Sequence, residues 1–199
     1  MLRRFRLATS VVAVLSATVL LASCVTYSVS PLYDAQTIFF EPALVGVWVE
    51  QTKDKPTTIT FTKSKTPDDS YDATYVDSEN TPPSMTFYHV HLAKLGGKVF
   101  LDAVLTGSSP APKNEDAASA NKYHLIARIS VDGDRFYLGL IDDNRLQEGF
   151  TSGKYSLPHE IVGDDAVLTA STAELQKFVA DHANDDQLFP LAEPLTRKK

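Results

Sequence analysis

The sequence predicts a mainly β protein with one C-terminal helix, built as an antiparallel up-and-down barrel or a strongly bent sheet. Short segments rich in β-branched and aromatic residues follow one another and are separated by Asp, Gly, Pro, Ser and Asn. A helical pattern then occurs once, close to the C-terminus. Antiparallel strands followed by one helix favour a closed or curved sheet with the helix against its side. The predicted strands are residues 43–51, 57–64, 71–78, 84–95, 98–105, 123–131 and 134–142.

The pair Gly96-Gly97 predicts a two-residue hairpin between the strands on either side of it. This turn places Leu92 opposite Leu101 on an apolar face. The reverse face of the hairpin is mixed, because it carries histidines and an aspartate among apolar residues.

The pair Asp132-Gly133 predicts a second hairpin with a turn of the same length. Its register places Ile129 opposite Phe136 on a uniformly apolar face. The other face carries Arg128 among polar neighbours, which suits exposure to solvent.

The helix is predicted near residues 172–184. Ser171 is suited to cap its first turn, and Glu174, three residues later, completes a capping box. Apolar residues then follow at helical spacing. Between the strands, residues 106–121 contain few apolar side chains and are expected to form a long mobile loop.

The chain begins with the layout of an export signal. Arg3, Arg4 and Arg6 form a basic start, and residues 7–21 are apolar and uncharged. This run is shorter than the roughly 20 apolar residues that a membrane-spanning helix needs, so cleavage is favoured over retention. Small residues at its end lead directly into the only cysteine of the chain, Cys24.

The motif Leu21-Ala22-Ser23-Cys24 resembles the lipobox of bacterial lipoproteins. In that class the cysteine sulfur receives a diacylglycerol, the signal is cut just before it, and the new amino terminus is acylated. The resemblance implies that Cys24 is lipidated and that residues 1–23 are a lipoprotein signal peptide. Several acyl chains on one cysteine make a durable membrane anchor, because a single chain binds only marginally.

The location and the charge of the processed chain restrict its partners. Lipoproteins with aspartate after the cysteine tend to stay in the inner membrane, and Val25 at this position implies the outer membrane. Cleavage removes three of the 19 basic residues and none of the 25 acidic ones, which changes the formal charge from −6 to −9. Nucleic-acid binding relies on Lys and Arg, so it is not expected. The expected partners are the membrane, through Cys24, and an apolar ligand or another envelope protein.

One folded domain is expected for a chain of this length. The polar, turn-prone residues after the cysteine are predicted to form a tether, and the last residues are predicted to fray. The expected division is residues 1–23 as signal peptide, 24–37 as tether, 38–189 as a single β-rich domain and 190–199 as a flexible tail.

The residues Gly46-Val47-Trp48 open the first predicted strand and resemble the Gly-X-Trp signature of lipocalins. In that family the tryptophan closes one end of a barrel and an arginine stacks on it; the sequence alone assigns no arginine to that role. The resemblance implies a lipocalin-like architecture with Trp48 as the barrel-closing residue. The alternative is that Trp48 is an ordinary core aromatic residue of a strand.

The common catalytic motifs are missing from the sequence, which contains no Gly-X-Ser-X-Gly elbow, no phosphate-binding glycine loop and no HExxH. We therefore expect no catalytic residue and no cofactor. The acidic runs Asp142-Asp143-Asn144 and Asp164-Asp165 lack the spacing and the glycine of a calcium loop, and Asp68-Asp69 lies in a polar turn. Paired acids in turns are predicted to be solvated.

One group of polar side chains has a geometry that the first hairpin predicts. His89 and His91 share a face of their strand because side chains alternate, and the register puts Asp102 across from His91. Two imidazoles and a carboxylate suit Zn²⁺ or Fe²⁺ with positions left open. They also suit a pH-responsive pair, because a nearby carboxylate raises the pKa of a histidine. The remaining interpretation is an exposed cross-strand pair with little effect on stability.

Three functions stay open at this point. The favoured one is a non-enzymatic, lipid-anchored envelope protein, a β-rich binding or interaction module for an apolar small molecule or another envelope protein. The second is a lipocalin-like carrier with a true internal cavity, which requires inward-facing residues too small to fill the barrel. The third is a metal-dependent enzyme that uses His89, His91 and Asp102.

Overall fold

A computed structural model describes residues 25–51, 54–111, 122–163 and 165–199. Cys24 and the predicted leader lie outside the described residues. Eight antiparallel strands form a barrel, which closes where β6 pairs with β7. This confirms the predicted mainly β class and the antiparallel barrel. The strands, in order around the barrel, are β2 (Gly46–Val49), β3 (Thr58–Lys63), β4 (Tyr71–Asp77), β5 (Ser84–Leu95), β6 (Lys98–Ser109), β7 (His124–Asp132), β8 (Arg135–Leu140) and β11 (Leu195–Arg197).

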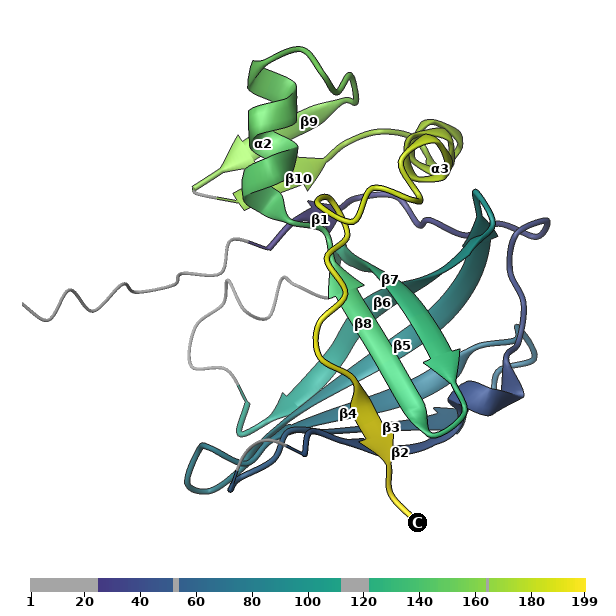
Figure 1. Ribbon diagram of the computed structural model, residues 1–199, viewed down its shortest axis with the longest axis vertical. Coiled ribbons are helices and arrows are strands. Elements are labelled where there is room, and N and C mark those ends of the chain that lie inside the picture. Colours follow the sequence, from purple (N-terminus) through teal and green to yellow (C-terminus); the bar gives the residue numbers. More distant parts are fainter. Residues whose placement is uncertain (1–24, 52–53, 112–121, 164) are drawn as a thin grey trace, which may run out of the picture.

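A second layer lies against one side of the barrel (Figure 1). It contains β1 (Tyr27–Ser28), α2 (Asp143–Thr151), β9 (His159–Val162), β10 (Asp165–Leu168) and α3 (Thr172–Asp181). β1 pairs with β7 beyond the end of β8, and β10 and β9 extend the sheet from β1. Within the described residues, no helix combines the length and apolar character needed to cross a membrane.

The prediction of a single helix is wrong, because the described residues contain two α-helices. α3 has the predicted capping box: Ser171 N–H donates to Glu174 Oε2 (2.9 Å), and Glu174 N–H donates to Ser171 Oγ (3.4 Å). α2 begins after Asp142, whose side chain accepts a hydrogen bond from Arg145 N–H (3.0 Å). The acidic run expected in a solvated turn is therefore the N-terminus of α2, where carboxylates are favourable.

β5 and β6 pair in the register that the Gly96-Gly97 turn predicts. β6 is longer than predicted, because it continues to Ser109. The first part of the expected loop 106–121 therefore belongs to this strand, and residues 112–121 lie outside the described part of the chain.

The second hairpin turns at Gly133-Asp134, one residue later than predicted. Gly133 has a φ of 58°, which glycine adopts without strain. Phe136 consequently pairs with Val131 instead of Ile129. Because the register differs by two residues, every side chain keeps its predicted face of the sheet.

The expected tether and tail are both wrong for the residues that the structure describes. Residues 25–37 contain β1 and the fully buried Leu32. Near the other end of the chain, β11 lies between β2 and β8, where Thr196 pairs with both Val49 and Arg135. Strands of two and three residues carry no periodic signal, so the sequence pattern does not reveal them.

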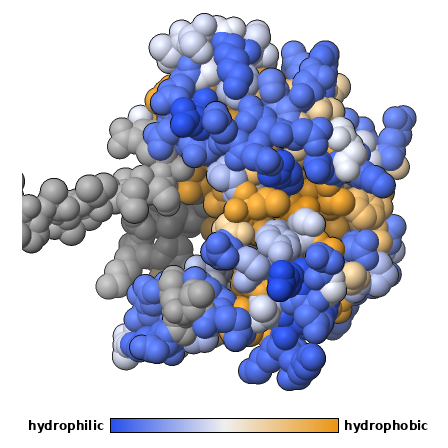
Figure 2. Space-filling view, in the orientation of Figure 1, coloured by the Kyte–Doolittle hydropathy of each residue, from blue (hydrophilic) through white to orange (hydrophobic). Residues whose placement is uncertain are grey.

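Apolar residues form two cores on opposite faces of the sheet. The first fills the interior at one end of the barrel and contains Trp48, Phe61 and Phe136. The second lies between the outer face of β5–β7 and the helical layer, where the rings of Phe100 and Phe189 have centroids 5.2 Å apart. In Figure 2, apolar surface gathers in the middle of the face, below the helical layer.

Arg128 joins the barrel to the second layer. Its guanidinium donates to the carbonyl oxygens of Ala183 (3.0 Å) and Phe189 (2.6 Å) and forms an ion pair with Asp186 (2.6 Å). The expectation that Arg128 faces solvent is wrong, since only 4% of this residue is exposed. The hairpin pattern contains no information about the layer that covers it.

Trp48 and the 3-10 helix η1 (Pro42–Leu44) fill one end of the barrel, the end at which the Gly96-Gly97 and Gly133-Asp134 turns lie. Trp48 is fully buried, and its Nε1–H donates to the carbonyl oxygen of Leu44 (2.9 Å). The Arg197 guanidinium lies 4.1 Å from the centroid of the Trp48 ring. Arg197 also donates to the carbonyl oxygen of Val45 (2.8 Å) and to η1. One side chain of β11 thus contacts both β2 and η1.

Gly46 permits this contact for two reasons. Its φ is 142°, a backbone conformation that residues with a side chain rarely adopt. A Cβ atom at Gly46 would also collide with the Arg197 guanidinium. The glycine and the tryptophan of Gly46-Val47-Trp48 therefore both serve the packing of Arg197.

We predict that Arg197→Lys lowers the free energy of unfolding by about 2 kcal/mol, because lysine loses the planar stacking on Trp48 and part of the hydrogen bonding to η1. Urea denaturation measures the effect. Arg135→Lys is the matched control, since Arg135 is exposed on the adjacent β8, and a change within about 0.5 kcal/mol is expected there. Equal effects of the two substitutions would contradict the role of Arg197.

Candidate functional site

The barrel interior holds a partly open cavity of about 500 Å³. It lies toward the end of the barrel opposite Trp48 and the Gly96-Gly97 turn. Residues of β3 to β8 form most of its wall. The wall is mainly apolar; Val90, Leu101, Leu105, Leu125 and Leu138 are among its residues. A concave, mostly apolar space of this size is typical of small-molecule binding.

The cavity exists because small side chains occupy inward-facing positions. Ala73, Ala103 and Ala127 line it from β4, β6 and β7. An eight-stranded barrel is just wide enough for ordinary core side chains to fill its interior. Alanines on three strands leave space that leucine or phenylalanine would occupy.

Four tyrosines add hydroxyl groups to this apolar wall: Tyr27, Tyr75, Tyr88 and Tyr123. The rings of Tyr27 and Tyr123 have centroids 5.9 Å apart. Burial raises the pKa values of Tyr27 and Tyr88 above the ordinary value of a tyrosine. Within the described part of the chain, none of the four hydroxyls has a hydrogen-bond partner, which leaves them available to the polar group of a ligand.

The structure brings together two of the three side chains predicted to form a polar site. His89 and His91 lie on the outer face of β5, with ring centroids 4.9 Å apart. Asp102 lies opposite His91 in the backbone register of β5 and β6, as predicted. The carboxylate of Asp102 is fully buried and has other partners. One oxygen lies 2.6 Å from His124 Nδ1, and the other accepts a hydrogen bond from Leu32 N–H (2.6 Å). Asp102 therefore fastens the N-terminal segment to the barrel.

Asp68 occupies the position predicted for Asp102. Its Oδ2 lies 3.3 Å from His91 Nε2 and 3.7 Å from His89 Nε2. Asp68 belongs to the turn between β3 and β4, which was expected to be solvated. No local pattern shows that this turn folds back toward β5, so the sequence carries no signal for the contact.

Burial and hydrogen bonding set the charge of this group. Burial lowers the pKa of His91, although the carboxylates of Asp68 and Asp102 act in the opposite direction. Hydrogen bonds from the hydroxyls of Ser70 and Thr66 lower the pKa of Asp68. The sequence alone predicted a raised pKa for a histidine beside a carboxylate, and the buried position of His91 reverses the direction.

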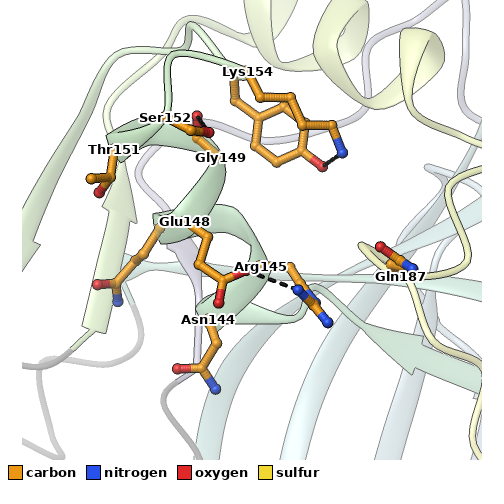
Figure 3. A pocket seen from close by; sticks show the side chains of 10 residues that line it. Asn144, Arg145, Glu148, Gly149, Thr151, Ser152, Lys154 and Gln187 are labelled. Atoms are coloured by element: carbon orange, nitrogen blue, oxygen red, sulfur yellow. Dashed lines mark hydrogen bonds and ion pairs between the residues drawn. The ribbon is translucent and has the colours of Figure 1, made fainter.

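A larger hollow of about 740 Å³ lies along α2 (Figure 3). Its side chains are mostly exposed and bonded to one another: Arg145 pairs with Glu148 (2.9 Å), and Lys154 Nζ donates to Tyr155 Oη (3.0 Å). Exposed pairs of this kind contribute little binding energy. The apolar barrel cavity is therefore the stronger candidate site.

Comparison with protein-family models, curated proteins and solved structures gave no match for this chain. The candidate site consequently stands on its geometry. Cys24, the predicted lipidation site, lies outside the described residues.

We predict that Asp102→Ala destabilises the protein by about 3 kcal/mol, because it leaves the buried N–H of Leu32 and the ring of His124 without their partner. Thermal or urea unfolding measures the loss. Asp181→Ala is the control, since it removes only an exposed ion pair with Lys177 on α3 worth about 0.3–0.5 kcal/mol. A loss at Asp102 as small as at Asp181 would show that the buried carboxylate is not a structural anchor.

Proposed function

We propose that this protein is an envelope lipoprotein, anchored through Cys24, whose barrel binds an apolar small molecule without chemical change. The observation that carries the proposal is the internal cavity of about 500 Å³, a size that encloses small-molecule ligands. Among the described residues, those that line the cavity include no His, Asp, Glu or Cys. This composition supports binding rather than catalysis.

The ligand that the cavity suits best is an amphiphile. Leu105 and Leu125 offer apolar contact to a hydrocarbon chain, and burial of each methylene contributes about 0.8 kcal/mol. Thr86 and the tyrosine hydroxyls offer hydrogen bonds to a polar group at one end of that chain. A long-chain acid, alcohol or similar lipid has both parts.

The closed end of the barrel supports a lipocalin-like architecture within this proposal. Trp48 is buried beside η1, and Arg197 stacks on its ring. The arginine that sequence reasoning left unassigned therefore has a candidate, contributed by the last strand of the barrel. Gly46, which precedes this tryptophan by two residues, is required by the same contact.

The position of the predicted anchor favours a ligand taken from the membrane. Val25 and Tyr27 line the cavity, and Val25 N–H donates to Asp165 Oδ1 (3.1 Å). Cys24 directly precedes Val25, so only about 3.8 Å of chain separates the lipidated residue from the cavity wall. An acylated Cys24 would hold this part of the cavity wall beside the bilayer, where apolar molecules are concentrated.

We predict that filling the cavity weakens binding while the fold is retained. Ala103→Phe places an aromatic ring inside the cavity, whereas Thr62→Phe adds the same ring at an exposed position of β3. The measurement is titration of the chain from Val25 onward with N-phenyl-1-naphthylamine, an apolar dye that fluoresces when it is removed from water. Ala103→Phe is expected to weaken dye binding about 10-fold or more, a loss of about 1.4 kcal/mol.

Circular dichroism serves as the check on folding in this experiment. Thr62→Phe is expected to bind the dye like the unmodified chain. If Ala103→Phe folds and still binds the dye with unchanged affinity, the dye does not enter the barrel and the proposed function is wrong.

A further inference from the structure

A cluster of metal-ligating side chains lies on the outer face of the barrel. His89 and His91 project from β5, and the turn between β3 and β4 brings Asp68 against them. One ligand atom from each of these three residues lies within 4.8 Å of the other two. The cluster is built from residues far apart in sequence, so it is a product of the fold.

The two distances from Asp68 to the histidines are close to those of a coordination shell. Zn²⁺ binds imidazole nitrogens and carboxylate oxygens at about 2.0–2.1 Å, so two ligand atoms at a tetrahedral angle are about 3.4 Å apart. Asp68 Oδ2 lies 3.3 Å from His91 Nε2 and 3.7 Å from His89 Nε2. The ligand atoms of the two imidazoles lie within 4.8 Å of each other, so an ion bound by all three residues would draw the two rings together by up to about 1.4 Å from this arrangement.

The carboxylate of Asp68 is oriented for this purpose. Its Oδ1 accepts hydrogen bonds from the hydroxyls of Thr66 (2.7 Å) and Ser70. Its Oδ2 faces both histidines. The local hydrogen bonds therefore hold one oxygen of Asp68 and direct the other toward the two imidazoles.

Neighbouring groups also orient the imidazoles. The ring of Tyr33 stacks on His91 with centroids 3.8 Å apart, and only 5% of His91 is exposed. The Nδ1 atom of His89 lies 3.5 Å from Asp72 Oδ1. A carboxylate on the second nitrogen of a ligating histidine is the usual outer partner of a metal site, because it fixes the ring and the tautomer.

We propose that Asp68, His89 and His91 form a Zn²⁺ site on the outer face of the barrel. Two imidazoles and one carboxylate suit this ion and leave a fourth position for water. Bound Zn²⁺ would fasten the β3–β4 turn to β5. The site is separate from the barrel cavity, and it uses Asp68 in place of the Asp102 that hairpin register alone indicated.

The test is Zn²⁺ titration of the purified full-length chain in competition with a chromophoric chelator. About one equivalent of Zn²⁺ per chain is expected to bind. Asp68→Asn removes a ligand and should weaken binding more than 10-fold, and Asp72→Asn should weaken it about 10-fold through His89. Asp69→Asn is the matched control, because it removes the same charge one residue away and asparagine tolerates the φ of 53° at Asp69. Affinity is expected to be unchanged in this control.

The cluster could instead be an ion pair without a metal, and a second measurement separates the two cases. X-ray absorption at the zinc edge of the unmodified protein should show two imidazoles and only nitrogen and oxygen ligands; sulfur would place the ion at Cys24, the only cysteine. Substoichiometric binding, sulfur ligation, or equal losses in Asp68→Asn and Asp69→Asn would overturn the proposal.

Discussion

The contact between Arg197 and Trp48 is the interaction on which the barrel depends most. β11 has only three residues, yet it alone joins β2 to β8. Without it, both neighbours would be edge strands with unpaired backbone groups. The guanidinium of Arg197 lies 4.1 Å from the Trp48 ring and also binds the backbone carbonyl oxygens of Val45 and Ala43. The strand that completes the ring of hydrogen bonds is therefore fixed at its last residue.

Closure of the sheet gives the barrel an interior, which contains the cavity, and an outer face, which packs against the helical layer. Trp48 and its aromatic neighbours fill one end of the interior, and the alanines at 73, 103 and 127 leave the remainder hollow. Because the hollow half contributes less packing, the apolar outer face of β5–β7 gains importance as a second core beneath α2 and α3. Arg128 and Asp102, both buried on that face, hold the covering segments in place.

The sequence predicted those structural features that are set by residues close together in the chain, such as turns and helix caps. The position of the Gly96-Gly97 turn sets the register of β5 and β6, because a two-residue hairpin loop allows only one pairing of the flanking residues. The capping box of Ser171 and Glu174 likewise predicted the start of α3. Features made by distant contacts had no such signal. Arg197 lies in a segment too short to show alternation, and Asp68 reaches the histidines only because its turn folds back toward β5. For the cluster on the outer face, the sequence predicted that His89 and His91 share a face but did not predict Asp68 as their carboxylate. For the interior, a hollow barrel was one of the alternatives that the sequence left open.

The central claim is that the barrel interior binds an apolar molecule. Nuclear Overhauser effects between decanoate and the methyl groups of the protein test it most directly, since they report contacts shorter than the width of the barrel wall. The account predicts contacts from the alkyl chain to inward-facing methyl groups such as those of Ala103, Leu105 and Leu125. Contacts confined to Ile161 and Val162, which are 52% and 57% exposed on β9, would contradict it.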